Sequence, residues 1–183
     1  MEKSDEEIIS LVLDGRKHEY RHLIHRYQRQ IYNLMFRYSR SGQDAADLTQ
    51  DVFLRAFEKL DGFEPGRAFF PWLYTLAVNR ANDWSRNCKR RNAHRQELID
   101  NTPERAERCS GQERMLEHRE ELERLQRGLD LLGNETREIL MLRFHHELSV
   151  KEVAGIFAIS ESAVKMRTAR GLQLLQSLLA EDK

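Results

Sequence analysis

The sequence is poor in the residues that end helices or cross-link small domains. Its 183 residues include only three prolines and two cysteines. Cys88 and Cys109 lack the spacing of a CxxC motif or a Cys/His finger, so we interpret both as reduced thiols. This spacing argues against a disulfide framework and against a zinc module. A strand would be predicted by an alternating run of Val, Ile and Thr bounded by glycine turns. The sequence contains no such run, so the expected fold is all-α.

Long apolar runs and enzyme motifs are also missing. No run approaches the roughly 20 residues of a membrane-spanning helix, and the acidic amino end has no signal-peptide pattern. We therefore expect a cytoplasmic protein. The sequence has no nucleophile with a positioned base, no phosphate-binding glycine loop and no metal-hydrolase motif. We expect no enzyme activity, no cofactor, no bound metal and no small-molecule substrate.

The net charge is zero, because 30 Lys and Arg residues balance 30 Asp and Glu residues. The charges are segregated along the chain. Residues 86–95 carry five Lys and Arg residues and no acidic residue, whereas residues 97–123 carry nine acidic residues and four arginines. The acidic segment weakens the non-specific attraction to nucleic acid, so we expect the protein to need a partner to bind DNA well.

Capping signals and helical spacing divide the chain into two small helical domains joined by a linker. Ser4 and Glu7 form a capping-box pattern that predicts a short helix ending at Leu13. Further helices are predicted at residues 18–39, 44–60, 71–91, 113–132, 135–144, 149–157 and 161–179. We assign residues 1–95 to the first domain, 96–128 to a charged, partly helical linker and 129–183 to the second domain.

The last forty residues have the pattern of a helix-turn-helix. Ser149 and Glu152 form a second capping box, and residues 158–160 supply the turn. In the second helix, helical spacing predicts a buried face made of Val164, Thr168, Leu172 and Leu175. The other face carries Lys165, Arg167 and Arg170 and no acidic residue, so it is suited to the phosphates of a DNA major groove.

The predicted helix at 44–60 has two distinct faces. Leu48, Val52, Ala56 and Leu60 can face a core. A stripe with i, i+3, i+4, i+7 spacing lies on another face and consists of Asp47, Gln50, Asp51 and Leu54. This composition is typical of a protein-docking surface, although a plain solvated face has the same spacing. The apolar Leu54 favours the docking surface.

The helix after Pro71 carries a polar row that becomes basic. The row consists of Thr75, Asn79, Asp83, Arg86 and Arg90, while Leu73, Leu76, Ala77 and Trp84 can pack inward. Arginines hold phosphate oxygens, and an Asn offers both a donor and an acceptor to an exposed base edge. The combination is suited to single-stranded DNA.

Three segments together resemble an extracytoplasmic-function (ECF) sigma factor of the sigma-70 family. They are Asp-Leu-Thr-Gln-Asp-Val-Phe at 47–53, Phe-Phe-Pro-Trp-Leu-Tyr-Thr-Leu-Ala-Val-Asn at 69–79, and the helix-turn-helix. Roughly, residues 20–91 are similar to region 2 of that family and residues 129–179 to region 4. Each motif is moderately specific, but their order and separation are highly specific.

The resemblance implies an alternative sigma factor that binds core RNA polymerase and directs promoter-specific initiation. Asp47, Gln50 and Asp51, with Leu54 in the same stripe, would dock on the β′ clamp helices, and the β flap would provide a second contact. The loop at 61–70 and the following helix would read and help to melt the minus-ten element. An anti-sigma factor is also implied.

The resemblance further implies two sets of promoter-binding residues. The minus-ten set is Phe63, Phe69, Thr75, Asn79, Arg80, Asp83, Arg86 and Arg90. The minus-35 set is Ser162, Lys165, Met166, Arg167, Ala169 and Arg170. An alternative for Phe63, Phe69 and Phe70 is that they anchor the loop in the core, as aromatics beside a glycine loop usually do.

Two other functions fit parts of the sequence. A dimeric helix-turn-helix regulator would bind duplex DNA without polymerase. A helical metal-binding or interaction protein would use His18, His22 and His25, which share one predicted helical face. His145, His146 and Glu147 resemble part of a di-iron motif, but the helix with the opposing motif is missing.

Overall fold

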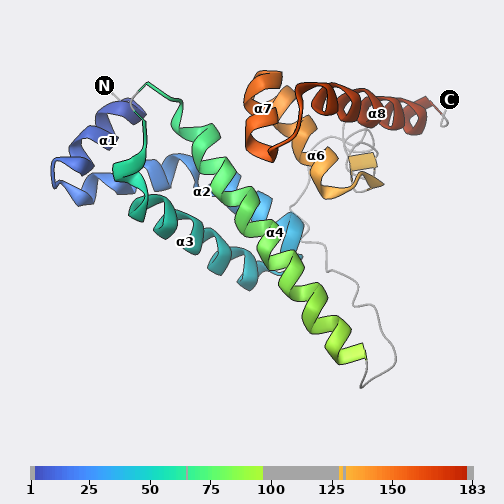
Figure 1. Cartoon of the computed structure of the whole chain (residues 1–183), viewed down its shortest axis with the longest axis horizontal. Coiled ribbons are helices and arrows are strands. Elements are labelled where there is room, and N and C mark those ends of the chain that lie inside the picture. The colour runs from blue at the N-terminus through green and yellow to red at the C-terminus, as the bar shows by residue number, and fades with distance from the viewer. Residues whose placement is uncertain (1–2, 65, 97–127, 130, 181–183) are drawn as a thin grey trace, which may run out of the picture. The chain divides into compact units, whose positions relative to one another are not determined.

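The computed structural model of the chain describes residues 3–64, 66–96, 128, 129 and 131–180. All regular elements among these residues are helices, and they form two compact units on either side of residues 97–127 (Figure 1). The prediction of two small all-α domains is therefore confirmed for the described parts of the chain. The predicted linker, apart from its two end residues, and most of the helix predicted at 113–132 lie outside the described residues.

The described part of the first unit contains α1 (Asp5–Leu13), α2 (Tyr20–Ser39), α3 (Gly42–Glu58) and α4 (Phe69–Gln96). The capping box at the start of α1 is confirmed, since Ser4 Oγ accepts from the Glu7 amide at 3.2 Å and Glu7 Oε2 accepts from the Ser4 amide at 2.7 Å. α2 begins later than predicted because Lys17–Glu19 form a 3₁₀ turn before it.

The core of the first unit lies between α2, α3 and α4, which pack on one another in pairs (Figure 1). As predicted, α3 and the turn after it bury Leu48, Val52, Ala56 and Leu60. The opposing helices bury large side chains too, among them Leu23, Ile31 and Leu34 of α2 and Leu73 and Tyr74 of α4. Burial of this apolar surface holds the outer face of α3 and the polar row of α4 in place.

α4 begins at Phe69, two residues before the predicted start at Pro71. Pro71 still lies in the first turn of the helix, where its missing N–H would have had no partner within the helix. The predicted loop at 61–70 is shortened further by a 3₁₀ turn at Leu60–Gly62.

The described part of the second unit contains α6 (Asn134–Leu140), a single π turn (Met141–His145), α7 (Val150–Phe157) and α8 (Glu161–Ala180). After the π turn, Glu147 adopts the left-handed conformation with a φ of +55°, and the chain turns there toward α7. A guanidinium N–H of Arg143 donates to the carbonyl of Leu148 and closes this corner.

The predicted helix-turn-helix is confirmed in α7 and α8. Ser149 Oγ accepts from the Glu152 amide at 3.2 Å, and Glu152 Oε2 accepts from the Ser149 amide at 2.8 Å. The turn passes through Ala158, which adopts the left-handed conformation with φ +52°. Ser160 Oγ then accepts from the amide of Ala163 at 3.2 Å and caps α8.

The buried face of α8 differs from the prediction at one position. Val164 and Leu175 are buried and Thr168 is half-buried, but Leu172 is 36% exposed. Gly171 is buried instead, against Leu140 and Thr136 of α6. The prediction for Leu172 was wrong because α6 crosses α8 over a residue without a side chain, which spacing alone does not reveal.

Candidate protein-docking and nucleic-acid interfaces

The outer face of α3 presents the stripe predicted from the sequence. Ser41 caps the helix by accepting from the amide of Asp44 at 3.3 Å, which fixes where the helical spacing begins. Asp47 and Gln50 are exposed, and Leu54 keeps 55% of its surface exposed. A single exposed apolar side chain is common on a protein surface, so Leu54 indicates a protein contact only together with the apolar surface beside it.

Asp51, the fourth residue of the stripe, is only partly exposed and has two basic partners. Its Oδ2 pairs with Nε of Arg80 from α4, and its Oδ1 lies 3.2 Å from Nε of Arg55. Burial alone would raise the pKa of Asp51, but the hydrogen bonds from Arg80 and Arg55 outweigh it and hold the pKa below its usual range. Asp51 is therefore a carboxylate in the described structure at neutral pH.

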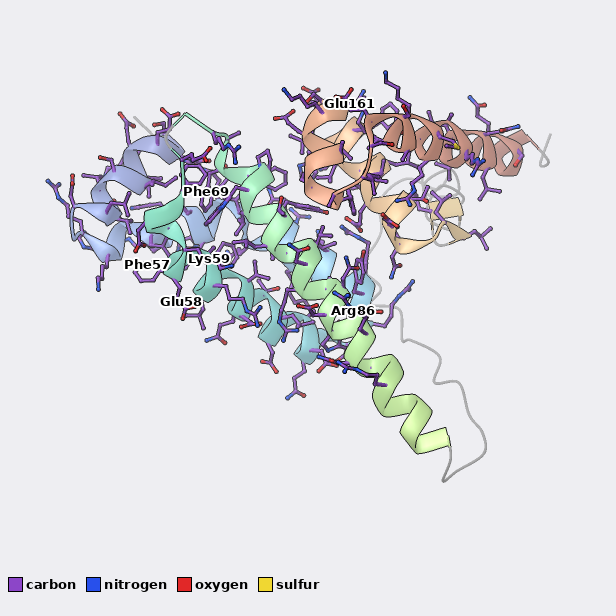
Figure 2. All side chains as sticks on the ribbon, viewed as in Figure 1. Phe57, Glu58, Lys59, Phe69, Arg86 and Glu161 are labelled. Carbon is purple, nitrogen blue, oxygen red and sulfur yellow. The ribbon has the colours of Figure 1, made fainter. Side chains whose placement is uncertain are left out.

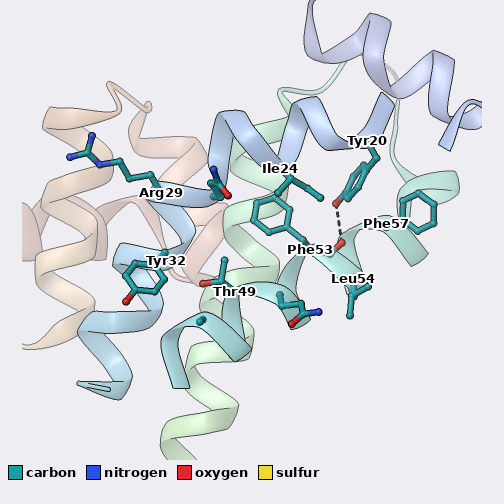
Figure 3. A pocket seen from close by; sticks show the side chains of 11 residues that line it. Tyr20, Ile24, Arg29, Tyr32, Thr49, Phe53, Leu54 and Phe57 are labelled. Carbon is teal, nitrogen blue, oxygen red and sulfur yellow. Dashed lines mark hydrogen bonds between the residues drawn. The ribbon is translucent and has the colours of Figure 1, made fainter. Parts of the chain in front are cut away.

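A groove of about 660 Å³ runs between α2 and α3 beside this stripe (Figure 3). Its lining is mainly apolar and aromatic and includes Ile24, Tyr32, Phe53, Leu54 and Phe57. Gln50 and Leu54 belong to both the groove and the stripe, so the two features form one continuous surface.

The groove keeps its shape through contacts of Tyr20 with α3. The Tyr20 hydroxyl donates to the carbonyl of Phe53 at 2.9 Å, as the dashed line in Figure 3 shows. The Tyr20 ring packs edge-on against Phe57 with 5.0 Å between ring centroids. The sequence analysis did not predict the groove, because Ile24 belongs to one helix and Phe53 and Phe57 to another, and helical spacing within one segment does not show that the two faces meet.

The aromatic residues around the loop before α4 lie in the core. Phe63 and Phe69 are 6% and 2% exposed, and their ring centroids are 5.8 Å apart. Trp72 packs against both rings. In this conformation neither phenylalanine can touch DNA, so their placement agrees with the alternative that they anchor the loop. Phe70 is half-buried and stacks on Tyr27 at 5.4 Å.

The polar row of α4 lies on the exposed side of that helix. Figure 2 labels Phe69, the first residue of α4, and Arg86, a member of the row further along the helix. Asn79, Asp83, Arg86 and Arg90 are exposed. The Thr75 hydroxyl donates to the carbonyl of Pro71 at 2.8 Å, which leaves its oxygen free only as an acceptor. Asp83 Oδ1 and Arg86 Nη2 form an ion pair at 2.8 Å. Arg80, which belongs to the predicted minus-ten set but not to this row, turns its side chain toward Asp51.

The outer face of α8 presents five of the six residues predicted there. Ser162, Lys165, Met166, Ala169 and Arg170 are exposed. Arg167 instead forms an ion pair with Glu135 of α6. An exposed pair of this kind is weak enough to exchange, but in the free protein it withdraws one positive charge from the face.

The histidine face does not lie on one continuous α-helix. His18 belongs to the 3₁₀ turn and His22 to α2, and Nε2 of each lies 3.5 Å from the carboxylate of Glu19. In the described part of the chain, no group of three or more His, Cys, Asp or Glu residues is arranged to hold a metal ion. Cys88 is half-buried and has a reduced thiol, and Cys109 lies outside the described residues. None of the described helices is long and apolar enough to cross a membrane.

Two family models match the chain, one for each unit. Sigma-70 region 2 matches residues 23–91, and Sigma-70, region 4 matches residues 128–177. The chain belongs to the sigma-70 family. Region 2 thus covers α3 with most of α2 and α4, and region 4 covers α7 with most of α8.

Individual relatives place the chain within this family. It is 30% identical over 168 residues to the RNA polymerase sigma factor CarQ of Myxococcus xanthus, which covers 92% of this chain and 93% of that relative. It is 29% identical over 181 residues to the ECF RNA polymerase sigma-E factor of Escherichia coli K12, covering 95% and 93%. The protein is therefore an alternative sigma factor of the ECF type, which directs transcription initiation.

A solved structure has the same fold. The sigma factor RpoE, in a co-crystal structure with the anti-sigma factor NepR from Bartonella quintana, is 23% identical, and the match covers 90% of this chain and 99% of that chain. The TM-score is 0.69.

Proposed function

We propose that the sigma factor binds core RNA polymerase through the stripe on α3 together with the adjoining groove. The observation that carries this proposal is the exposure of Leu54 at 55%, at a position shared by the stripe and the groove. Asp47 and Gln50 supply polar contacts beside this apolar centre, as in other protein interfaces. The resemblance to region 2 supports the β′ clamp helices as the partner.

Promoter reading would be divided between the two units. In region 2, Asn79, Asp83, Arg86 and Arg90 would meet the minus-ten element, with Thr75 as an acceptor and with Phe63 and Phe69 holding the loop from behind. In region 4, Ser162, Lys165, Met166, Ala169 and Arg170 would enter the major groove at the minus-35 element. Arg167 would join them after leaving Glu135.

The protein would contribute binding and positioning, whereas the polymerase supplies the chemistry, so we expect no catalytic activity from the sigma factor alone. Its place of action would be the bacterial cytoplasm, where core polymerase meets the chromosome. The complex of RpoE with NepR supports an anti-sigma factor as a further partner. Such an inhibitor would compete with polymerase if it covered the same α3 surface.

In vitro transcription tests this proposal. Purified protein, added to core polymerase and promoter-bearing templates, should create specific start sites that core polymerase alone does not use. Without polymerase the protein should bind duplex promoter DNA weakly, since its net charge is zero. Unchanged start sites would refute the proposal, and palindromic footprints from the protein alone would favour a dimeric regulator.

A further inference from the structure

One ion pair joins the proposed polymerase-docking helix to the proposed DNA-reading helix. Asp51 lies on the outer face of α3, and Arg80 lies on α4, 29 residues further along the chain. The second partner of Asp51, Arg55, belongs to α3 itself, one turn after Asp51. Of these two pairs, the one with Arg80 joins α3 to α4.

Arg80 is placed to hold α4 rather than to touch DNA. Its side chain is 22% exposed, whereas Asn79 and Asp83 on the same helix are exposed. The buried neighbours of Arg80 on α4 are Ala77 and Ala81, both 0% exposed. The larger buried side chains of α4, Leu73 and Tyr74, lie nearer its start. Next to Arg80 the small alanines make few contacts, so the directional charged hydrogen bond to Asp51 adds a constraint on rotation there.

The charge state of Asp51 supports a permanent pair. The two arginines outweigh burial and keep the pKa of Asp51 below its usual range, so the carboxylate stays charged at neutral pH. Each of its oxygens accepts one hydrogen bond from an arginine, and a carboxylate has about four acceptor sites. Asp51 can therefore receive a donor from polymerase without releasing Arg80.

We propose that Arg80 is a positioning residue for promoter opening, which acts by setting the rotation of α4 relative to α3. Through its pair with Asp51 it aims Asn79 and Asp83 at the minus-ten element while the docking stripe is bound to polymerase. This inference rests on the proposed function of the two helices. It also gives Asp51 a role in DNA opening beyond its contact with polymerase.

The experiment measures promoter opening with the full-length sigma factor and core polymerase. A fluorescent base in the minus-ten element reports the opening rate, and polymerase is titrated to saturation for every variant. Arg80→Met and Asp51→Asn should each slow opening by about tenfold or more at saturation, since small displacements of positioned groups carry costs of this size. Arg80→Lys keeps the charge and should recover a large part of the rate.

Arg55→Met is the matched control. It removes the other arginine bonded to Asp51, but it leaves α3 and α4 joined, so opening should stay within about twofold of the wild-type rate. The double variant Asp51→Asn with Arg80→Met should be no slower than the slower single variant, because both changes remove one interaction.

Two outcomes would overturn the inference. If Arg80→Met opens the promoter at the wild-type rate when polymerase is saturating, the pair does not position α4. If Arg80→Met opens the promoter slowly but Asp51→Asn opens it at the wild-type rate, Arg80 acts through a direct DNA contact. Circular dichroism checks folding, and if Arg80→Met does not fold, Asp51→Asn carries the same comparison. Failure of the proposed function is distinct, since the wild-type protein itself would then neither bind polymerase nor open DNA.

Discussion

Gly171 of α8 approaches Leu140 of α6 more closely than any other residue type would allow without adjustment. A Cβ atom at Gly171 would lie 3.0 Å from Cδ1 of Leu140 and 3.1 Å from Cγ2 of Thr136. Leu140 also belongs to the buried cluster with Leu132 and Leu175. The close crossing therefore fixes the position of α8 against α6 within region 4.

Gly171→Ala should destabilise region 4 by about 0.5–2 kcal/mol net, because displacing Leu140 and Thr136 costs about 1–3 kcal/mol, whereas Ala gains about 0.5–1 kcal/mol over Gly within a helix. Gly155→Ala in α7 is the matched control, since nothing lies within 4 Å of its Cβ position. That change should stabilise the helix by about 0.5–1 kcal/mol. Hydrogen exchange of the α8 amides in the full-length protein measures both, and equal protection in the two variants would contradict the close crossing.

Ala158→Gly should stabilise the helix-turn-helix. Ala158 has a φ of +52° in the turn between α7 and α8, where a residue with a Cβ is strained by about 1–2 kcal/mol. Glycine removes that strain but adds entropy to the unfolded chain, so we expect a net gain of about 0.5–1 kcal/mol. Ala169→Gly, within α8, should lose about 1 kcal/mol. Hydrogen exchange of the α7 amides during chemical denaturation compares the stability of the two variants. A lower free energy of unfolding for both variants would contradict the prediction.

Leu54→Ala should weaken binding to core polymerase by about tenfold without lowering thermal stability, because the side chain is exposed but central to the docking surface. Leu13→Ala on α1 is a suitable control, since Leu13 is 50% exposed and lies away from the stripe and the groove. A fluorescence titration with core polymerase gives both affinities. Equal affinities for the two variants would remove Leu54 from the interface.

The capping box of α7 should make region 4 less stable in acid. Hydrogen bonds from the Ser149 hydroxyl and the Ser149 backbone lower the pKa of Glu152 from its usual 4.5. A carboxyl group with a lowered pKa in the folded state stabilises the fold fully above its unfolded pKa and loses that contribution as the pH falls through the folded value.

Glu152→Gln isolates this effect. Gln can still accept from the Ser149 amide but does not titrate, so the stability difference between wild type and variant should shrink below about pH 4.5. Denaturation of the full-length protein between neutral and acid pH measures the difference. A difference that does not change with pH would show that Glu152 does not titrate as part of the cap.

Local features of the sequence predicted much of the fold. Ser4, Ser149 and Ser160 each cap a helix through a bond to an amide three residues later, and such short-range bonds can be read from residue types. Helical spacing predicted the inward face of α3 correctly for the same reason. It failed at Leu172, because the approach of α6 depends on a second helix.

The sequence by itself determined where the main helices lie, which residues form the outer stripe of α3, and the family. Only the tertiary structure decided which of the outward charges are already paired. Arg80 and Arg167 belong to the two predicted promoter-binding sets, but they pair with Asp51 and Glu135, 29 and 32 residues away. The groove beside Leu54 and the burial of Phe63 and Phe69 also arise only when separate helices meet. The reason is physical: caps and helical faces follow from bonds within one turn, whereas pairing and burial require two segments to come together in space.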